Sequence, residues 1–389
     1  MGKKRVIEEP PSAARTDVDD SPAKKKGKTT AKSASPSPKK SSTPTKKPVS
    51  SSVDSIPYAA LATRDIRVDA RRLAKIMTWN VAGLRGTLKK NPTILQTLAK
   101  AHDLDFLCIQ ETKVSEEQIK KELPNDILPG YRAFWSSSIT KKGYSGTSTF
   151  RADGASEEAA PKKAATKKLT DFFGGGAKKA AAADPAPVSQ AASTQPLKGR
   201  IVRTELDLQG TKHSGEGRTI MIELDTFFLV ACYVPNSGQN LERLDYRVDE
   251  WFPDMRAYLK KLNEIKPVVY CGDLNVAHLD LDIYNFDAKH IVKQSGCTPR
   301  EREAFGKMLE TGFVDAFRHF HPDASGHYTY WSMRTFARNS NKGLRLDYFV
   351  CSLDLTDQSE APRIQDCYDI PTDTLGLSDH APAMLVLEL

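Results

Sequence analysis

The stretch VVYCGDLNVAH, residues 268–278, runs from an apolar segment directly into a carboxylate and an amide. Its first four residues, Val268–Cys271, have the composition of a buried strand. Asp273 and Asn275 follow two positions apart, so their side chains lie on the same side of an extended chain. A strand that only had to end could do so with any turn residues, so this pair points to a chemical role.

Six polar motifs of this kind occur where predicted strands begin or end. Besides Asp273-Leu274-Asn275 they are Trp79-Asn80, Gln110-Glu111-Thr112-Lys113, Tyr233-Val234-Pro235-Asn236, Arg345-Leu346-Asp347-Tyr348 and Ser378-Asp379-His380. One such motif is usually a turn or a helix cap, but six in one chain favour a shared site. They supply carboxylate oxygens for a hard cation such as Mg²⁺, an Asp–His pair and amide donors. These groups suit the attack of water on a phosphodiester.

Strand-like and helical patterns alternate from about residue 71 onward. Strands are predicted at 105–110, 201–208, 219–224, 227–234, 268–271, 346–350 and 383–389. The clearest helical pattern is Leu241–Ile265, where apolar residues recur at steps of three and four. Strands mixed with helices favour a layered α/β or α+β domain.

Two low-complexity segments flank or interrupt this pattern. Residues 1–70 are rich in Ser, Pro, Lys and Ala and are predicted to be a disordered basic arm. Residues 153–198 are predicted to be a disordered insertion, because so long a structureless loop is uncommon in a compact domain. The remainder of 71–389 is large enough for one core, so we predict one domain with an insertion.

The formal net charge of +8 is concentrated in these segments. Residues 1–70 hold 15 Lys/Arg against 8 Asp/Glu, and residues 151–200 hold 9 against 5. Basic tails attract polyanions at long range, whereas the near-neutral body must recognise its partner by shape and chemistry. Charged residues make up 27% of the chain and no apolar run approaches membrane-spanning length, so no membrane association is expected.

The cysteines and the N-terminus indicate the cell interior. The six cysteines form no C-x-x-C pair and several lie in apolar runs, as reduced, buried thiols do. The N-terminus lacks the apolar core of a secretory signal. Lys24-Lys25-Lys26 and Lys39-Lys40 resemble nuclear-localisation signals, which predicts a nuclear protein, with a merely solubilising arm as the open alternative.

Seven motifs together resemble the exonuclease III family of AP endonucleases, especially its eukaryotic nuclear branch. In chain order they are TWNVAGLR, FLCIQETK, GYSG, YVPNSG, GDLNVAH, LDYF and LSDHAP. The resemblance covers about residues 71–150 and 200–389. It implies a four-layered α/β sandwich of two mixed, mainly antiparallel sheets flanked by helices, with strand ends converging on the active site.

The resemblance also implies three overlapping sets of site residues. The catalytic set is Asp273, Asn275, His380, Asp347 and Tyr233. The set around Mg²⁺, for which Mn²⁺ could substitute, is Glu111, Asn80, Asp379, Asp273, Asn275 and His380. The substrate-binding set is Asn236, Lys113, Arg85, Tyr144, Arg218, Gln239, Tyr330, Leu344 and Leu346.

Each implied role has a chemical reason. Asp273 would orient or deprotonate the attacking water, and Asn275 would hydrogen-bond the phosphate as charge develops. Glu111 would hold the cation, and His380, oriented by Asp347, would donate to the scissile phosphate. The implied activity is cleavage 5′ to an abasic site in double-stranded DNA by a monomer, with weaker 3′-phosphodiesterase and 3′–5′ exonuclease activities.

Several positions depart from the family pattern. Ala82 stands where members usually have Asp or Asn, and Gln239 stands where animal members carry an Arg. Tyr330, Leu344 and Leu346 align with Phe, Trp and Leu of the animal abasic-sugar pocket. The smaller Leu344 could loosen selection against normal nucleotides or shift the balance toward 3′ trimming.

Within the insertion, Thr166–Phe173 (TKKLTDFF) resembles the motif that docks proteins onto the replication sliding clamp. Leu169, Phe172 and Phe173 have the required spacing, so that one helical turn would gather them into an apolar plug. Thr166 departs from the usual Gln.

Other polar and aromatic residues are expected to be structural. Trp79 and Trp331 are predicted core anchors, and His278 is expected to cap or pack. Asp354, Asp357 and Asp366 are expected at the surface, and the residues expected to form a solvated helix face are Glu242, Arg243, Asp245 and Arg247.

Two other functions are open. A phosphatase acting on inositol lipids, or a nonspecific nuclease of the same superfamily, would keep the site but needs different loops. A scaffold with a dead site would require the loss of Glu111, Asp273, Asn275 or His380, and all four are present.

Overall fold

The computed structural model of this protein describes residue 66 and residues 72–123, 127–153 and 199–389. The predicted basic arm, the predicted insertion and the clamp-like motif at 166–173 lie almost entirely outside the described residues. Within the described part of the chain, no helix has the length and apolar character needed to cross a membrane.

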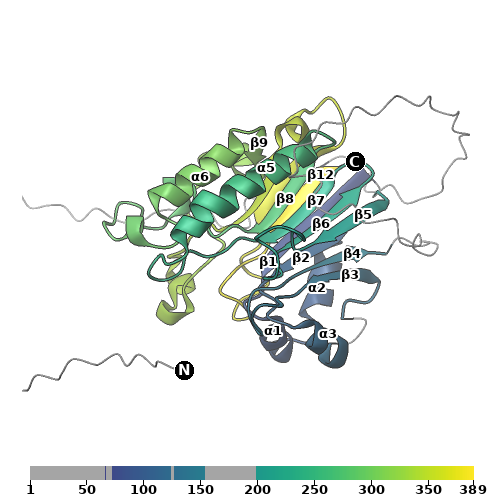
Figure 1. Cartoon of the computed structure of the whole chain (residues 1–389), viewed down its shortest axis with the longest axis horizontal. Helices are drawn as coiled ribbons and strands as arrows, with labels where there is room; N and C mark the ends of the chain where they lie inside the picture. Colours follow the sequence, from purple (N-terminus) through teal and green to yellow (C-terminus); the bar gives the residue numbers. More distant parts are fainter. Residues whose placement is uncertain (1–65, 67–71, 124–126, 154–198) are drawn as a thin grey trace, which may run out of the picture. The chain divides into compact units, whose positions relative to one another are not determined.

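Two six-stranded sheets form the centre of the structure (Figure 1). The first has the order β11-β12-β1-β2-β4-β3, with strands β1 Leu73–Asn80, β2 Phe106–Gln110, β3 Tyr131–Ser136, β4 Thr147–Ala152, β11 Arg363–Asp369 and β12 Ala383–Glu388. The second has the order β5-β6-β7-β8-β10-β9, with strands β5 Ile201–Leu206, β6 Thr219–Leu224, β7 Phe228–Tyr233, β8 Val268–Asp273, β9 Phe313–Asp315 and β10 Asp347–Ser352. Each sheet has one parallel pair, β1–β2 or β7–β8, and is otherwise antiparallel.

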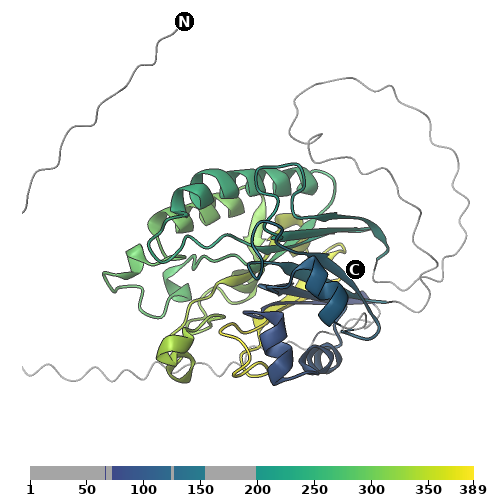
Figure 2. The same ribbon diagram turned by 60° about the horizontal axis from the view of Figure 1, so that its bottom comes forward.

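Helices cover the outer faces of both sheets, as Figure 2 shows from a second direction. The outer helices are α1 Leu84–Lys90, α2 Ile94–His102, α3 Glu116–Glu122, α5 Phe252–Asn263 and α6 Pro299–Leu309, whereas α7 Ala316–Phe320 contributes Ala316 and Phe317 to the cluster between the sheets. The short turns are the π-helical η3 Tyr246–Trp251 and the 3-10 turns η4 Asp280–Asp282, η5 Ile291–Lys293, η6 Met333–Thr335, η7 Ala337–Ser340 and η8 Leu353–Thr356. The predicted four-layered sandwich of mixed, mainly antiparallel sheets is therefore confirmed.

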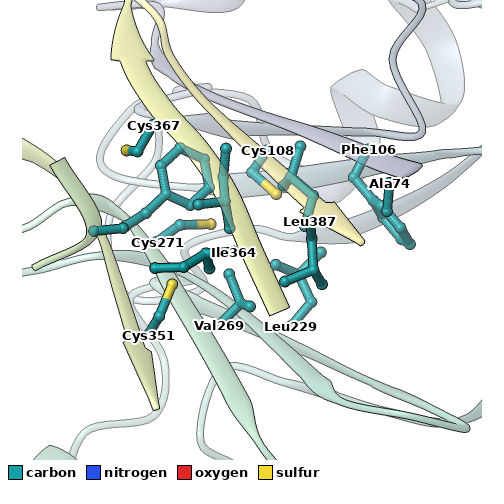
Figure 3. Packing of buried hydrophobic residues seen from close by; sticks show 14 of the residues in the cluster. Ala74, Phe106, Cys108, Leu229, Val269, Cys271, Cys351, Ile364, Cys367 and Leu387 are labelled. Carbon is teal, nitrogen blue, oxygen red and sulfur yellow. The ribbon is translucent and has the colours of Figure 1, made fainter. Parts of the chain in front are cut away.

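The central core lies between the two sheets, where side chains from both inner faces interdigitate (Figure 3). Phe106 and Cys108 of the first sheet pack in one cluster with Leu229, Val269 and Cys271 of the second. Further clusters bury α1 and α2 against the first sheet, and α5 and α6 against the second. All six cysteines are free and buried, as predicted.

The topology brings the polar motifs to one edge. Asn80 ends β1, Gln110 ends β2 and Asp273 ends β8. Asp347 begins the antiparallel neighbour β10, where it pairs directly with Asp273. Residues far apart in the chain therefore meet where the two central strand pairs finish.

Several local predictions were wrong, for identifiable reasons. The helix predicted at 241–265 begins only at Tyr246, with a π-helical turn, and α5 ends at Asn263. Strand β4 was missed because Thr147, Ser148 and Thr149 are hydroxylated yet fully buried, so their hydropathy hides their location. Asp366, expected at the surface, is 1% exposed in β11.

A buried ion network ties η4 to the start of β10. Arg345, 1% exposed, donates to Asp282 Oδ1 at 2.8 Å and contacts Asp315, while Arg318 also pairs with Asp282. Burial opposes the charge on Asp282, but Arg345 and Arg318 outweigh it and lower the pKa of this carboxyl to about 2. The network therefore holds a charged carboxylate beneath the segment that leads to Asp347.

Replacing Asp282 by Asn should lower the free energy of unfolding at neutral pH by about 3 kcal/mol, because Arg318 loses its buried carboxylate partner and Arg345 keeps only Asp315. The folded-state pKa lies below the ordinary value, so this stabilisation is full above about pH 4 and is lost as the pH falls toward about 2. Urea unfolding of both proteins across this pH range measures the difference.

The matched control is Asp280→Asn, whose carboxylate pairs with Arg302 at the surface. Its free energy of unfolding should change by less than about 1 kcal/mol. Equal unfolding midpoints for the two variants at neutral pH would contradict the importance of the buried network.

Candidate active site

The amide of Asn80 joins the two sheets at their common edge. Its Nδ2 donates to Glu111 Oε1 at 3.0 Å and to Asp273 Oδ2 at 2.8 Å. Its Oδ1 accepts from the backbone N–H of Ala82 at 2.9 Å, which fixes the orientation of the amide. One neutral side chain thus holds two carboxylates that would otherwise repel each other.

His380 lies beside Asp273 and is oriented by Asp347. Its Nδ1 is 2.8 Å from Asp347 Oδ2, and its Nε2 is 3.8 Å from Asp273 Oδ2. The indole of Trp79 donates to the carbonyl of His380 at 3.3 Å, and Ser378 accepts from the His380 N–H at 3.1 Å. The predicted core role of Trp79 is therefore confirmed, since it is fully buried beneath the site.

The buried charges shift each other's pKa. Burial alone would lower the pKa of the His380 imidazole, but the carboxylates of Asp347 and Asp273 outweigh it and raise that pKa to about 10. Burial raises the pKa of the Asp273 carboxyl to about 7, with Asp347 and Glu111 adding to the rise and His380 opposing it. At neutral pH His380 is consequently charged, while Asp273 can exchange a proton readily.

The Asp273–Asn275 loop has a shape that explains its residue types. Asn275 has a left-handed φ of 52°, a conformation that Asn tolerates better than most residues. Its N–H donates to Asp273 Oδ1 at 2.9 Å, and its side chain donates to the carbonyl of Val234 at 2.9 Å. A Cβ on Gly272 would lie 1.9 Å from the carbonyl oxygen of Cys232, so only glycine allows β7 and β8 to approach here.

Arg247 supports this loop from beneath, although it was expected on a solvated helix face. It is 0% exposed, and its guanidinium donates to the carbonyls of Leu274 at 2.9 Å and Asn275 at 2.6 Å. Its Nη1 pairs with Glu301 Oε1 at 2.6 Å. Arg247 therefore fixes the backbone that presents Asp273 and Asn275, and the expectation of a solvated residue is corrected.

Glu301 extends the same support to Ser237 and to the segment Gly296–Thr298. Its Oε2 accepts from Gly296 N at 2.9 Å and from Thr298 Oγ1 at 2.7 Å, while Ser237 donates to its Oε1. Thr298 and Glu301 form a capping box that starts α6. The spacing T-x-x-E was visible in the sequence and could have located this helix start.

Glu111 and Asp379 are two further carboxylates of the site, and both line the cavity at this edge of the sheets. Glu111 Oε2 is 2.7 Å from Lys113 Nζ, and Tyr233 also hydrogen-bonds this carboxylate. Burial opposes the charge on Glu111, but Lys113 outweighs it, so the pKa of this carboxyl lies below its ordinary value. These hard oxygen donors fit a cation such as Mg²⁺, which binds through one or two carboxylates plus water.

Asp273, Asp347 and His380 form a second possible ligand group, with one donor atom of each within 4.8 Å of the others. However, His380 Nδ1 and Asp347 Oδ2 already hydrogen-bond each other, which leaves fewer donor atoms for an ion in this group. Asn80 likewise uses both ends of its amide within the protein. The donor set thus favours an ion on the Glu111 and Asp379 side.

A cavity of about 430 Å³ opens onto these groups. Its lining comprises Glu111, Asn236, Gly238, Gln239, Asp273, Asn275, Gln294, Ser295, Tyr330, Arg334, Leu344, Leu346, Asp379 and His380. Tyr330, Leu344 and Leu346 form an apolar wall, and the Tyr330 ring lies 5.0 Å from the His380 ring. The cavity therefore combines an acidic, hydrogen-bonding end with an apolar end.

The structure separates some predicted substrate-binding residues from the cavity. Arg85 is exposed and pairs with Glu122 at 2.9 Å. Arg218 is 1% exposed and donates to the Tyr144 hydroxyl at 2.7 Å and the Tyr233 carbonyl at 3.0 Å. Arg218 therefore positions Tyr144 and Tyr233 rather than touching a substrate itself.

Other predicted residues, and some that were missed, line the cavity or sit near it. Asn236 donates to Asn275 Oδ1 at 2.8 Å and accepts from Ser295 at 2.9 Å. Gln294, Ser295 and Arg334 were not predicted, because they lie in or next to short 3-10 turns without a recognisable motif. His278 packs edge-on against Phe305, with ring centroids 5.0 Å apart, as its structural interpretation predicted.

Comparison with known proteins gives the class to which this site belongs. Residues 77–380 match the model of the Endonuclease/Exonuclease/phosphatase family. The match spans most of the chain, so the protein belongs to the Endonuclease/Exonuclease/phosphatase family.

Individual relatives show which members of this family the chain is similar to. The chain is 38% identical over 316 residues to the DNA repair nuclease APEX1 of Danio rerio, covering 80% of this chain and 82% of the relative. It is 35% identical over 315 residues to an exodeoxyribonuclease of Bacillus subtilis, covering 81% and 100%. The crystal structure of an AP endonuclease from Leishmania major superposes with a TM-score of 0.65 at 29% identity, covering 85% of this chain and 94% of that one. The resemblance to AP endonucleases stated from the motifs is confirmed.

Replacing Arg247 by Met should lower the free energy of unfolding by about 3–5 kcal/mol, because Glu301 is left buried without its partner. The turnover of phosphoester hydrolysis should also fall, because the carbonyls of Leu274 and Asn275 lose their donors. The double variant Arg247→Met/Glu301→Met should recover part of the stability but none of the turnover. Chemical denaturation and steady-state kinetics on the same samples measure both effects.

The matched control is Arg300→Met, which removes a guanidinium that pairs with Asp245 and Asp249 at the surface. It should leave turnover unchanged. Full turnover in the folded double variant would show that Arg247 stabilises the fold without positioning the loop.

Proposed function

We propose that this protein is an AP endonuclease of DNA base-excision repair. It hydrolyses the phosphodiester 5′ to an abasic site and leaves a 3′-hydroxyl and a 5′-deoxyribose phosphate, with minor 3′-phosphodiesterase and 3′–5′ exonuclease activities. The observation that carries the proposal is the placement of charged His380 beside Asp273, a carboxylate that can take up a proton near neutral pH, at the acidic end of a cavity whose other wall is apolar. The names of the relatives, a DNA repair nuclease and an exodeoxyribonuclease among them, support it.

The roles follow from the contacts. The Asp273 carboxylate accepts a proton from the attacking water, whose oxygen bonds to phosphorus as the bond from phosphorus to the 3′ oxygen breaks. The departing 3′ oxygen takes a proton from solvent water and becomes the 3′-hydroxyl. The amides of Asn275 and Asn236 donate to the phosphate oxygens as negative charge builds. His380, held charged by Asp347 at 2.8 Å, donates from its free Nε2 and stabilises the same charge.

We propose Mg²⁺ as the cofactor, with Mn²⁺ as a substitute. Glu111 and Asp379 would hold the ion, and it would supply positive charge next to the phosphate. The excess of carboxylates over cations at this end of the cavity supports the proposal, since such a site attracts a divalent cation and repels a bare phosphodiester.

The apolar wall would select the abasic nucleotide. A deoxyribose without a base is cheap to move out of a duplex, because no stacking or pairing is lost. Tyr330, Leu344 and Leu346 offer such a sugar an apolar surface and few polar partners. A normal nucleotide could enter the cavity only together with its base, and removing that base from the stack costs free energy.

The full-length protein should cut a duplex that contains one tetrahydrofuran abasic analogue immediately 5′ to the analogue, with Mg²⁺ and not with EDTA. Asp273→Asn should reduce the rate by at least about a hundredfold, because the variant keeps the shape but not the base. Denaturing gel electrophoresis resolves the products. Asp354→Asn, a change at an exposed position in η8, is the control and should cut normally.

Other outcomes of that assay would support the competing functions. Equal cleavage of the analogue and of intact duplex would indicate a general nuclease, with Leu344 the first residue to examine. No cleavage of either by folded protein would contradict the proposal and favour a phosphatase or a scaffold.

Two further proposals concern segments outside the described residues. We propose nuclear localisation through the basic arm of residues 1–70, supported by its lysine clusters, and sliding-clamp binding through Leu169, Phe172 and Phe173. A fluorescent fusion of the whole chain should enter the nucleus and co-purify with the clamp. Replacing the three apolar residues by Ala should abolish only the co-purification, and deleting 1–70 should abolish only the nuclear entry. Unchanged behaviour of either variant would refute the corresponding proposal.

A further inference from the structure

Two loops beside the cavity expose large apolar side chains to solvent. Tyr284 and Phe286 follow η4 and are 46% and 52% exposed. Met333 and Phe336 lie in and after η6 and are 49% and 75% exposed. We call these four residues, three of which are aromatic, the aromatic rim.

Backbone pairing connects the rim to the catalytic residues. Ile283 bridges Leu344, Leu344 bridges Tyr330, and Tyr330 bridges His380. Tyr284 itself donates its N–H to the carbonyl of Gly343 at 3.1 Å. Neighbouring extended segments lie about 5 Å apart, and three such steps separate the backbone beside Tyr284 from that of His380.

The second of these loops carries charges that suit a phosphate backbone, whereas the first carries Asp287 and Lys289, which offset each other. Between Trp331 and Gly343 the sequence contains Arg334, Arg338 and Lys342 and no acidic residue. Arg334 lines the cavity, and Lys342 Nζ lies 5.5 Å from the centre of the Tyr284 ring. No described carboxylate forms an ion pair with Arg334 or Lys342, so both cations are available to a polyanion.

We propose that the aromatic rim binds the unpaired bases of a single DNA strand that enters the cavity, by stacking them on Tyr284 and Phe286. This inference rests on the proposed action on DNA and adds to the site a binding surface for the unpaired bases beside the reacting nucleotide. Bases inside a duplex are already stacked on each other, so only unpaired bases can use these rings. Aromatic rings beside cations are how proteins bind single strands without regard to sequence.

The test measures binding by the full-length protein in EDTA, by fluorescence anisotropy, with two probes of equal length. One is a thymidine strand with a single central tetrahydrofuran analogue, and the other consists of tetrahydrofuran units throughout and has no bases. The wild type should prefer the strand with bases by roughly tenfold or more, because each stacked base contributes favourably.

The double variant Tyr284→Ala/Phe286→Ala should lose this preference, and Tyr284→Phe/Phe286→Tyr should retain it because both rings remain. The matched control is Leu353→Ala, since Leu353 is 54% exposed but follows the far end of β10 from Asp347. A preference that survives in the double alanine variant would overturn the inference. An equal loss of binding to both probes would also overturn it, because bases would then play no part.

Cleavage of the duplex analogue by the wild type in Mg²⁺ is recorded in parallel. Absence of that cleavage would refute the proposed function whatever the binding shows. Normal duplex cleavage together with an unchanged base preference in the alanine variant would refute the stacking role alone.

Discussion

The hydrogen bonds that Asn80 donates to Glu111 and Asp273 are the interaction on which the site depends. Asp273 lies 193 residues further along the chain and in the other sheet, yet the two side chains meet at 2.8 Å. The Ala82 N–H occupies the oxygen of the amide, so the nitrogen must face the carboxylates. Face-to-face packing of the two sheets brings this edge together, and one oriented amide then sets the distance between its acidic groups.

Repulsion among carboxylates explains why the common edge of the two sheets needs a rigid backbone. Asp273 and Asp347 are buried with a single imidazole between them, and Glu111 and Asp379 open onto the same cavity. Burial, with the neighbouring carboxylates adding to it, raises the pKa of Asp273, and attraction to Asp347 and Asp273 outweighs burial and raises the pKa of His380. Such a group is stable only if its backbone cannot relax, and Arg247 and Glu301 provide that rigidity from a layer with no access to solvent.

The sequence was informative where chemistry and strand ends coincide, and uninformative where burial is decided by tertiary contacts. Asp273, Asn275 and Glu111 stand out because polar residues interrupt apolar runs, and the topology does bring them together. Arg247 could not be recognised, because its helix begins with a π-helical turn, in which an extra residue changes which side chains face inward. Asp366 was misjudged for a related reason, since a backbone donor allows a charged group to be buried that hydropathy places outside.

The residues that set the reaction and those that would choose the substrate belong to different parts of the structure. Asp273, Asn275 and His380 are buried and held by hydrogen bonds from several elements. Leu344 contributes only an apolar surface to the cavity, and Tyr284 and Phe286 are half exposed. Exposed side chains such as Tyr284 and Phe286 can change at little cost to stability, whereas a change beneath the catalytic loop leaves a buried charge unpaired. A fold built in this way can keep one hydrolytic geometry while the wall and the rim adjust which strand, and which nucleotide, reaches it.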